Sequence, residues 1–255
     1  IYSLFSGKDT NKDQSYFLCQ LSQYQLSKVM FPIGDLDKKE VRLIAKQQNL
    51  ITAEKKDSQG LCFVGKVKLP EFLQQKLKVK KGKVILISKN NEIFNSVSDP
   101  DDFSVQNLKL MSNPYNYSID NGSVIGNHDG AHFFTIGQRK GLAIGGTKEP
   151  LFVIGTDVVN NLVYVGEGKN HPGLYRKVLF VLEKNFHRLR EDYDYTDSKL
   201  FDTRIRYRQP LQKSQLVFTE NGTFFIFDKP QSSITKGQFV VWYNGDELIG
   251  SGVID

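Results

Sequence analysis

The C-terminal half of the sequence consists of short apolar segments separated by turn sequences, and this pattern restricts the fold more than any other feature. The segments are rich in β-branched and aromatic residues, as β-strands are. Glu220-Asn221-Gly222 and Tyr243-Asn244-Gly245-Asp246 are typical hairpin turns. Many short strands joined in this way predict a closed or nearly closed antiparallel β-barrel. We expect strands at 151–155, 162–165, 178–183, 200–207, 215–219, 223–227, 238–243 and 248–254.

The first 80 residues show a helical period instead. We expect one helix over residues 14–27, a second that begins after Asp37 with Glu40 completing a capping box, and a third with Pro70 in its first turn. Asn49 suits a left-handed residue at the end of the second helix. The buried stripe of that helix is predicted to be Val41, Ile44 and Ala45.

These patterns predict an α+β protein with a small helical or mixed domain followed by the barrel. We place the first domain at residues 1–149 and the barrel at 150–255. A short strand is expected at 84–87, where four apolar residues precede an Asn-Asn turn. Residues 95–124 are polar and contain Asp-Pro and Asn-Pro pairs, so we expect a long insertion or mobile loop there.

Composition narrows the class of protein. The 255 residues carry a net charge of +6 and a pI of about 9.1, which suits a phosphate-rich partner such as RNA but also occurs in ordinary basic proteins. No apolar run is long enough for a membrane helix. Two cysteines do not make a disulfide scaffold, and they fit a reducing cytoplasm. None of the four histidines pairs with a cysteine at zinc spacing, so we expect no metal site.

Cys62 is the candidate reactive group. It lies between Gly60 and Gly65 in a stretch with several lysines, and nearby positive charge favours the reactive thiolate. The alternative is an inert, buried cysteine, which we expect for Cys19 in the first helix. Residues 60–67 also nearly match a phosphate-binding loop, but Val67 replaces the Ser or Thr that would hold magnesium.

Basic residues gather at two further places. Arg139 and Lys140 lie in a glycine-rich stretch, residues 137–146, where backbone and charge can approach a phosphate; the alternative is a basic surface turn. In the strand predicted at 200–207, alternation places three arginines on one face beside Tyr207, which can stack on a base. The alternative is an edge strand protected by charge. These arginines are Arg204, Arg206 and Arg208.

Several segments together resemble the bacterial tRNA-specific 2-thiouridylases, in the order of that family. They are Asn-Lys-Asp-Gln-Ser-Tyr-Phe-Leu at 11–18, Phe-Pro-Ile-Gly at 31–34, Lys-Asp-Ser-Gln-Gly-Leu-Cys-Phe-Val-Gly at 56–65, Thr-Ile-Gly-Gln-Arg-Lys-Gly-Leu at 135–142, Arg-Tyr-Arg-Gln at 206–209, Gly-Gln at 237–238 and Tyr-Asn-Gly-Asp at 243–246.

The resemblance implies an enzyme that uses ATP and Mg²⁺ to adenylate the wobble uridine 34 of tRNA and then places sulfur on its C2 atom. Cys62 would carry the sulfur as a persulfide, supplied by a sulfur-relay protein. The anticodon loop and stem of the tRNA would contact Lys12, Asp13, Gln14, Arg206, Tyr207 and Gln238. Arg139 and Lys140 are added to these contacts because of their charge in a glycine-rich turn.

The sequence lacks two features of the family pattern. The ATP-binding sequence Ser-Gly-Gly-x-Asp-Ser and a second reactive cysteine do not occur in these residues. We therefore expect a C-terminal fragment that lacks the ATP-binding domain and is inactive alone, an expectation that the absence of an initial Met also favours. A non-catalytic RNA-binding module is the alternative, and a phosphate-loop nucleotidase is a third interpretation.

Overall fold

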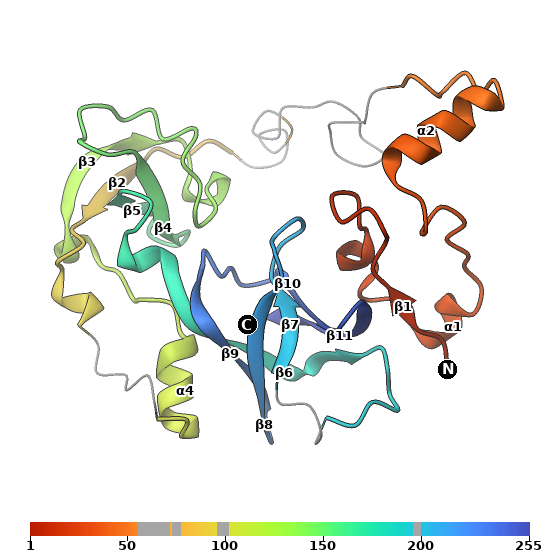
Figure 1. Cartoon of the computed structure of the whole chain (residues 1–255). Helices are drawn as coiled ribbons and strands as arrows, with labels where there is room; N and C mark the ends of the chain where they lie inside the picture. The colour runs from red at the N-terminus through yellow and green to blue at the C-terminus, as the bar shows by residue number, and fades with distance from the viewer. Residues whose placement is uncertain (56–71, 73–77, 96–101, 196–199) are drawn as a thin grey trace. The chain divides into compact units, whose positions relative to one another are not determined.

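The computed structural model describes residues 1–55, 72, 78–95, 102–195 and 200–255 (Figure 1). The chain forms two compact units, which we describe separately. The first contains residues 1–58, 180–229 and 236–255, and the second contains residues 59–179 and 230–235. The predicted α+β class with an antiparallel barrel is confirmed.

Six strands close into the barrel of the first unit. Around the barrel their order is β11, β10, β7, β8, β9 and β6, and pairing of β11 with β6 closes the circle. The predicted hairpins at 220–222 and 243–246 join β8 to β9 and β10 to β11. The strands are β6 (Tyr175–Arg188), β7 (Leu200–Arg204), β8 (Gln212–Thr219), β9 (Gly222–Ser232), β10 (Phe239–Asn244) and β11 (Glu247–Ile254).

Large aromatic side chains fill the barrel, and one glycine makes room for them. Trp242, Phe224 and Phe225 are almost wholly buried, and burial of rings of this size is a major source of stability. The Trp242 ring lies against Gly250 of the neighbouring strand, where an added Cβ atom would come within 2.3 Å of the ring atom Cζ2. Position 250 therefore has to be glycine for the ring to pack against the strand.

The N-terminal residues of the first unit contain less helix than predicted. A 3₁₀ turn, η1 (Ser15–Leu18), and a short helix, α1 (Gln23–Leu26), replace the single helix expected over 14–27, because Ser22 caps α1 and starts a new helix there. The helix α2 (Lys38–Gln47) begins at Asp37 with the predicted capping box, and Asn49 has the predicted positive φ of 52°.

The predicted buried stripe of α2 is wrong. None of the residues of α2 is buried, and 43% of Ile44 is exposed to solvent. The spacing of apolar residues along a helix indicates that the helix has an apolar face, but it does not indicate whether a neighbouring element covers that face. The third expected helix, with Pro70 in its first turn, lies outside the described residues.

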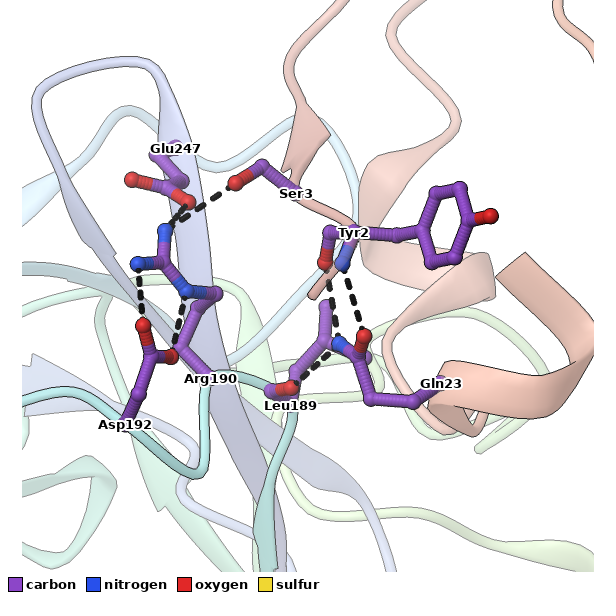
Figure 2. Close-up of polar contacts among 7 residues, drawn as sticks. All are labelled: Tyr2, Ser3, Gln23, Leu189, Arg190, Asp192 and Glu247. Atoms are coloured by element: carbon purple, nitrogen blue, oxygen red, sulfur yellow. Dashed lines mark hydrogen bonds and ion pairs between the residues drawn. The ribbon is translucent and has the colours of Figure 1, made fainter. Parts of the chain in front are cut away.

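Polar contacts join the first residues of the chain to the barrel (Figure 2). The Arg190 guanidinium makes two hydrogen bonds to Asp192 (2.8 and 2.9 Å), contacts Glu247 on β11, and donates to the Ser3 hydroxyl (3.0 Å). Beside it, the Gln23 amide exchanges hydrogen bonds with the backbone of Tyr2 and donates to the Leu189 carbonyl. The strand β1 (Leu4–Phe5) then pairs with β11, so residues 1–26 are part of the barrel unit.

The second unit is built on a four-stranded sheet with the order β3, β2, β5 and β4. β2 and β5 are parallel, and the outer pairs are antiparallel. Alternate residues of β2 face two separate cores, Val84 on one side of the sheet and Ile85 and Ile87 on the other. The strands are β2 (Gly82–Ile87), β3 (Ser123–His128), β4 (Leu151–Asp157) and β5 (Leu162–Glu167).

This sheet corrects the predicted start of the barrel. The sequence analysis placed the barrel at 150–255, but β4 and β5 pair with β2 and with each other, and the first barrel strand is β6. Strands of either sheet have the same apolar pattern, so the pattern alone does not assign a strand to a sheet.

The segment expected to be an insertion or loop contains ordered structure where it is described. The helix α4 (Val105–Ser112) is capped by Ser104, and its Leu108 is fully buried. The Arg176 guanidinium contacts the carbonyl of Ser112 at the C-terminal end of this helix and donates to the carbonyl of Ile234 (2.9 Å). Burial lowers the pKa of Arg176 to about 10, which still leaves it charged at neutral pH. A positive charge at the C-terminal end of a helix interacts favourably with the helix dipole and stabilises the helix.

We predict that Arg190→Ala lowers the free energy of unfolding by about 2–3 kcal/mol, since several charged hydrogen bonds at a partly buried guanidinium are lost together. Lys213→Ala is the control, because it removes an exposed ion pair with Asp202 from the same barrel and is expected to cost less than about 1 kcal/mol. Urea titration followed by tryptophan fluorescence measures both. Equal losses for the two variants would show that the contacts of Arg190 do not hold residues 1–26 to the barrel.

Candidate functional site

The segment 11–18 is held against the barrel by a buried carboxylate. Asp13 is 4% exposed, and its Oδ1 accepts hydrogen bonds from the backbone N–H groups of Gly7 (3.2 Å) and Ser15 (3.0 Å). Its Oδ2 accepts from the Ser15 hydroxyl (2.8 Å) and pairs with Arg204 at the end of β7 (3.3 Å). The carboxylate is therefore fully engaged inside the protein and is not part of the surface.

Two tyrosines extend this network into the barrel. The Tyr243 hydroxyl lies 3.0 Å from the Ser15 hydroxyl, whose single proton goes to Asp13, so Tyr243 is the donor. The Arg204 guanidinium lies over the Tyr243 ring, 5.0 Å from its centre. Tyr16 donates to the carbonyls of both Ile205 and Phe239 (3.0 Å each). Burial raises the pKa of Tyr16 and of Tyr243 to about 12, so both keep their protons at neutral pH.

On the surface above this network, the segment meets the end of the arginine strand. The Gln14 side-chain amide donates to the Tyr207 hydroxyl (2.9 Å), although the two residues are 193 positions apart. Tyr16 bridges the backbones of Ile205 and Phe239, so Gln238, which precedes Phe239, belongs to the same region. The side-chain oxygen Oε1 of Gln238 is buried and has no hydrogen-bond partner within the described part of the chain. The first unit thus contains all six contact residues that the family resemblance implied: Lys12, Asp13, Gln14, Arg206, Tyr207 and Gln238.

The prediction that three arginines share one strand face is wrong. β7 ends at Arg204, which is buried against Asp13, and the chain then turns. The turn is fixed by Gln209, whose Oε1 accepts from the Ile205 N–H (2.9 Å), and by the left-handed φ of 64° at Arg208. Arg206 is half-buried and Arg208 is exposed. Alternation holds only within a strand, so it does not apply beyond residue 204.

The glycine-rich segment lies in the second unit. The Gln138 side chain accepts from the Thr135 N–H (3.1 Å) and donates to the Lys140 carbonyl (2.8 Å), so it closes the turn from inside. Leu142 is buried in the sheet core and anchors the segment that follows. Arg139 and Lys140 are left exposed, and Arg139 borders an open hollow of about 600 Å³ that runs along residues 142–151.

The two cysteines differ in what the structure describes. Cys62 lies outside the described residues. Cys19 is fully buried, as predicted, in the core cluster with Leu4, Tyr16 and Leu248, and burial raises the pKa of its thiol.

In the described ranges, no group of His, Cys, Asp and Glu residues is arranged to hold a metal ion. None of the described helices has the length and apolar character that a membrane crossing requires.

Three family models match successive parts of the chain. A model described as the tRNA methyl transferase HUP domain matches residues 1–66, one described as the tRNA methyl transferase PRC-barrel domain matches residues 113–167, and one described as the aminomethyltransferase beta-barrel domain matches residues 176–254. Two relatives match the whole chain, both named tRNA-specific 2-thiouridylase MnmA: that of Christiangramia forsetii at 57% identity and that of Flavobacterium johnsoniae at 56%. The chain belongs to the tRNA-specific 2-thiouridylase family.

The chain spans about 65% of the length of those two relatives. A third relative, the tRNA-specific 2-thiouridylase MnmA of Halalkalibacterium halodurans, is 43% identical over the whole chain, which spans 59% of its length. The HUP match corrects one detail of the sequence analysis. Residues 1–66, which were assigned to the first domain (1–149), match the HUP domain model, so part of a HUP domain is present in the chain.

The sequence analysis did not identify Phe17 as a surface residue of the candidate site. Phe17 lies within the helix expected over residues 14–27 and was given no role there, yet it is 60% exposed and its ring centre lies 4.6 Å from that of Tyr207. The only signal in the sequence was its place next to a polar segment, which does not tell an exposed aromatic residue from a core one.

We predict that Asp13→Asn destabilises the chain by about 3 kcal/mol, because it leaves Arg204 buried without its counter-charge. The double variant Asp13→Asn/Arg204→Gln, which removes both charges, should recover part of that loss. The measurement is a double-mutant cycle of unfolding free energies. Additive effects of the two substitutions would show that the pair contributes no interaction energy.

Proposed function

We propose that this chain is part of an enzyme that transfers sulfur from a persulfide on Cys62 to C2 of the ATP-activated wobble uridine 34 of tRNA. The observation that carries the proposal is the 57% identity, along the entire chain, to a protein named tRNA-specific 2-thiouridylase. These residues would supply the sulfur-carrying cysteine and the surfaces that bind tRNA.

Cys62 takes part in two successive exchanges in this proposal. Its thiolate first attacks the outer sulfur of a persulfide on a relay protein, which leaves as a thiolate. The terminal sulfur of Cys62 then attacks C2 of the activated uridine, a C–S bond forms, and the bond from C2 to the adenylated oxygen breaks with release of AMP. A second thiol must then attack the inner sulfur atom to free the thiolated base.

Cys19 does not fit the role of that second thiol. It is fully buried and its carbonyl is bonded to the Ser251 hydroxyl (2.7 Å), so the residue is fixed in the core. The second thiol, and the binding of ATP and Mg²⁺, are therefore assigned to parts of the full-length enzyme other than these 255 residues. The described residues do not fit a metal site either, and no Ser-Gly-Gly-x-Asp-Ser sequence occurs in the chain. We infer that the chain alone does not complete the reaction.

The tRNA would contact each unit on a basic surface. In the first unit the surface contains Lys12, Gln14, Arg206, Tyr207 and Gln238, where cations can neutralise phosphates and an aromatic ring can stack. In the second unit it contains Arg139 and Lys140. The proposal gives Asp13 a different part from the direct contact first expected, because its buried carboxylate holds Lys12 and Gln14 in place.

The partners in this proposal are the anticodon loop and stem of tRNA and a persulfide-donating relay protein. A reducing cytoplasm is the proposed location, because Cys62 acts as a free thiolate. The alternative is a non-catalytic RNA-binding module, which the net charge of +6 and the exposed Arg139 and Lys140 also support but which gives Cys62 no role.

We predict that Cys62→Ser in the full-length enzyme abolishes 2-thiouridine formation, while Cys19→Ser leaves at least half of it. Serine cannot carry a persulfide, whereas Cys19 is a core residue whose loss affects only packing. The measurement is mass spectrometry of nucleosides from tRNA of cells that carry only the variant. Normal thiolation in the Cys62→Ser strain would favour the RNA-binding module.

We also predict that Arg139→Gln and Lys140→Gln each weaken tRNA binding and lower the slope of log affinity against log salt by about 0.7–0.9, the value for one phosphate contact. Lys89→Gln, an exposed lysine of the same unit, is the matched control and should leave the slope unchanged. Filter binding at several salt concentrations provides the slopes. Unchanged slopes for both variants would remove this surface from the proposal.

A further inference from the structure

Beside Gln14, the exposed ring of Phe17 lies against the half-buried ring of Tyr207. Phe17 is 60% exposed, and its ring is tilted by 45° from that of Tyr207 at a centre-to-centre distance of 4.6 Å. Exposing a large ring to water is unfavourable. Its partner Tyr207 contacts two exposed polar side chains, those of Gln14 and Arg208.

The structure holds Tyr207 in a fixed orientation. The Gln14 amide donates to its hydroxyl (2.9 Å), and the Arg208 guanidinium lies over its ring, 5.1 Å from the ring centre. Arg208 reaches this position through a left-handed backbone with a φ of 64°, which residues other than glycine rarely adopt. A ring fixed in this way loses little entropy when a flat ligand stacks beside it.

We propose that Phe17, Tyr207 and Arg208 form a stacking platform for one unpaired base of the RNA. This inference rests on the proposed function and adds Phe17 and Arg208, as base-contacting residues, to the tRNA contacts given above. Unpaired bases stack on aromatic rings and on guanidinium planes, and both kinds of surface are present here within one unit.

A base fits this surface better than a protein partner. Stable protein interfaces bury about 800 Å² on each side and have an apolar centre. Here the apolar surface consists of two rings with a guanidinium against one of them, which is the scale of a single base. The net charge of +6 also favours a polyanionic ligand.

The test compares Phe17→Ala with the unchanged chain in binding to a tRNA anticodon stem-loop and to a series of the same stem-loop with one loop base removed at a time. We expect Phe17→Ala to weaken binding to the intact RNA about 5- to 150-fold, the range for loss of one stacked base. The slope against salt should stay unchanged because no cation is removed. For one member of the abasic series, Phe17→Ala should weaken binding less than about 2-fold.

Two further variants keep the test specific. Tyr24→Ala is the matched control, because Tyr24 is also an exposed ring of the first unit (74%) with a cation, Lys28, above it, and its loss should leave binding unchanged. Phe17→Leu keeps an apolar side chain but removes the flat ring, so it should lose most of the affinity while the far-ultraviolet circular dichroism of the chain stays the same.

Two outcomes would overturn the platform. One is intact binding in Phe17→Ala, and the other is an equal loss with every abasic RNA, which would mean that no base rests on the ring. Cys62→Ser leaves all these contacts unchanged, so its thiolation result bears on the proposed function and not on the platform.

Discussion

The Asp13 carboxylate is the constraint on which the first unit depends. It is buried, so its charge is tolerable only with the hydrogen bonds from Gly7 and Ser15 and the ion pair with Arg204. These partners come from two ends of the sequence. The segment around Asp13 therefore cannot leave the barrel without exposing an unpaired Arg204, and this fixes Gln14 beside Tyr207.

In the second unit, an uncharged side chain holds the turn that carries the basic residues. A single amide, that of Gln138, closes the turn, and Leu142 anchors it in the sheet core, so Arg139 and Lys140 need no ion pair to be held at the surface. In each unit, a buried or inward-facing group does the positioning and leaves cations and rings at the surface. The motif residues of this family thus divide into those that hold the surface and those that form it.

The sequence predicted what depends on local rules. The capping box at Asp37 and Glu40, the left-handed Asn49 and the hairpin turns follow from a few adjacent residues, and all are confirmed. The wrong predictions concern long-range packing. The assignment of residues 151–167 to the barrel and the buried stripe of α2 both required knowledge of which element lies beside another, which periodicity does not contain.

The candidate site shows the same division. The family resemblance pointed to Tyr207 and Gln14, but only the fold shows that Asp13 lies inside, that β7 stops at Arg204, and that Phe17 faces solvent. Each of these depends on contacts between residues nearly two hundred positions apart or on where a strand ends. Such contacts leave no trace in the spacing of a single sequence.

The central claim is that the Cys62 thiol carries a transferable sulfur atom. The most direct measurement is mass spectrometry of the Cys62 peptide after the complete enzyme has been incubated with its sulfur donor and without tRNA. The account predicts one additional sulfur atom on this side chain, which disappears when tRNA and ATP are added. A Cys62 peptide that never gains sulfur under these conditions, while the enzyme still thiolates tRNA, would contradict the account.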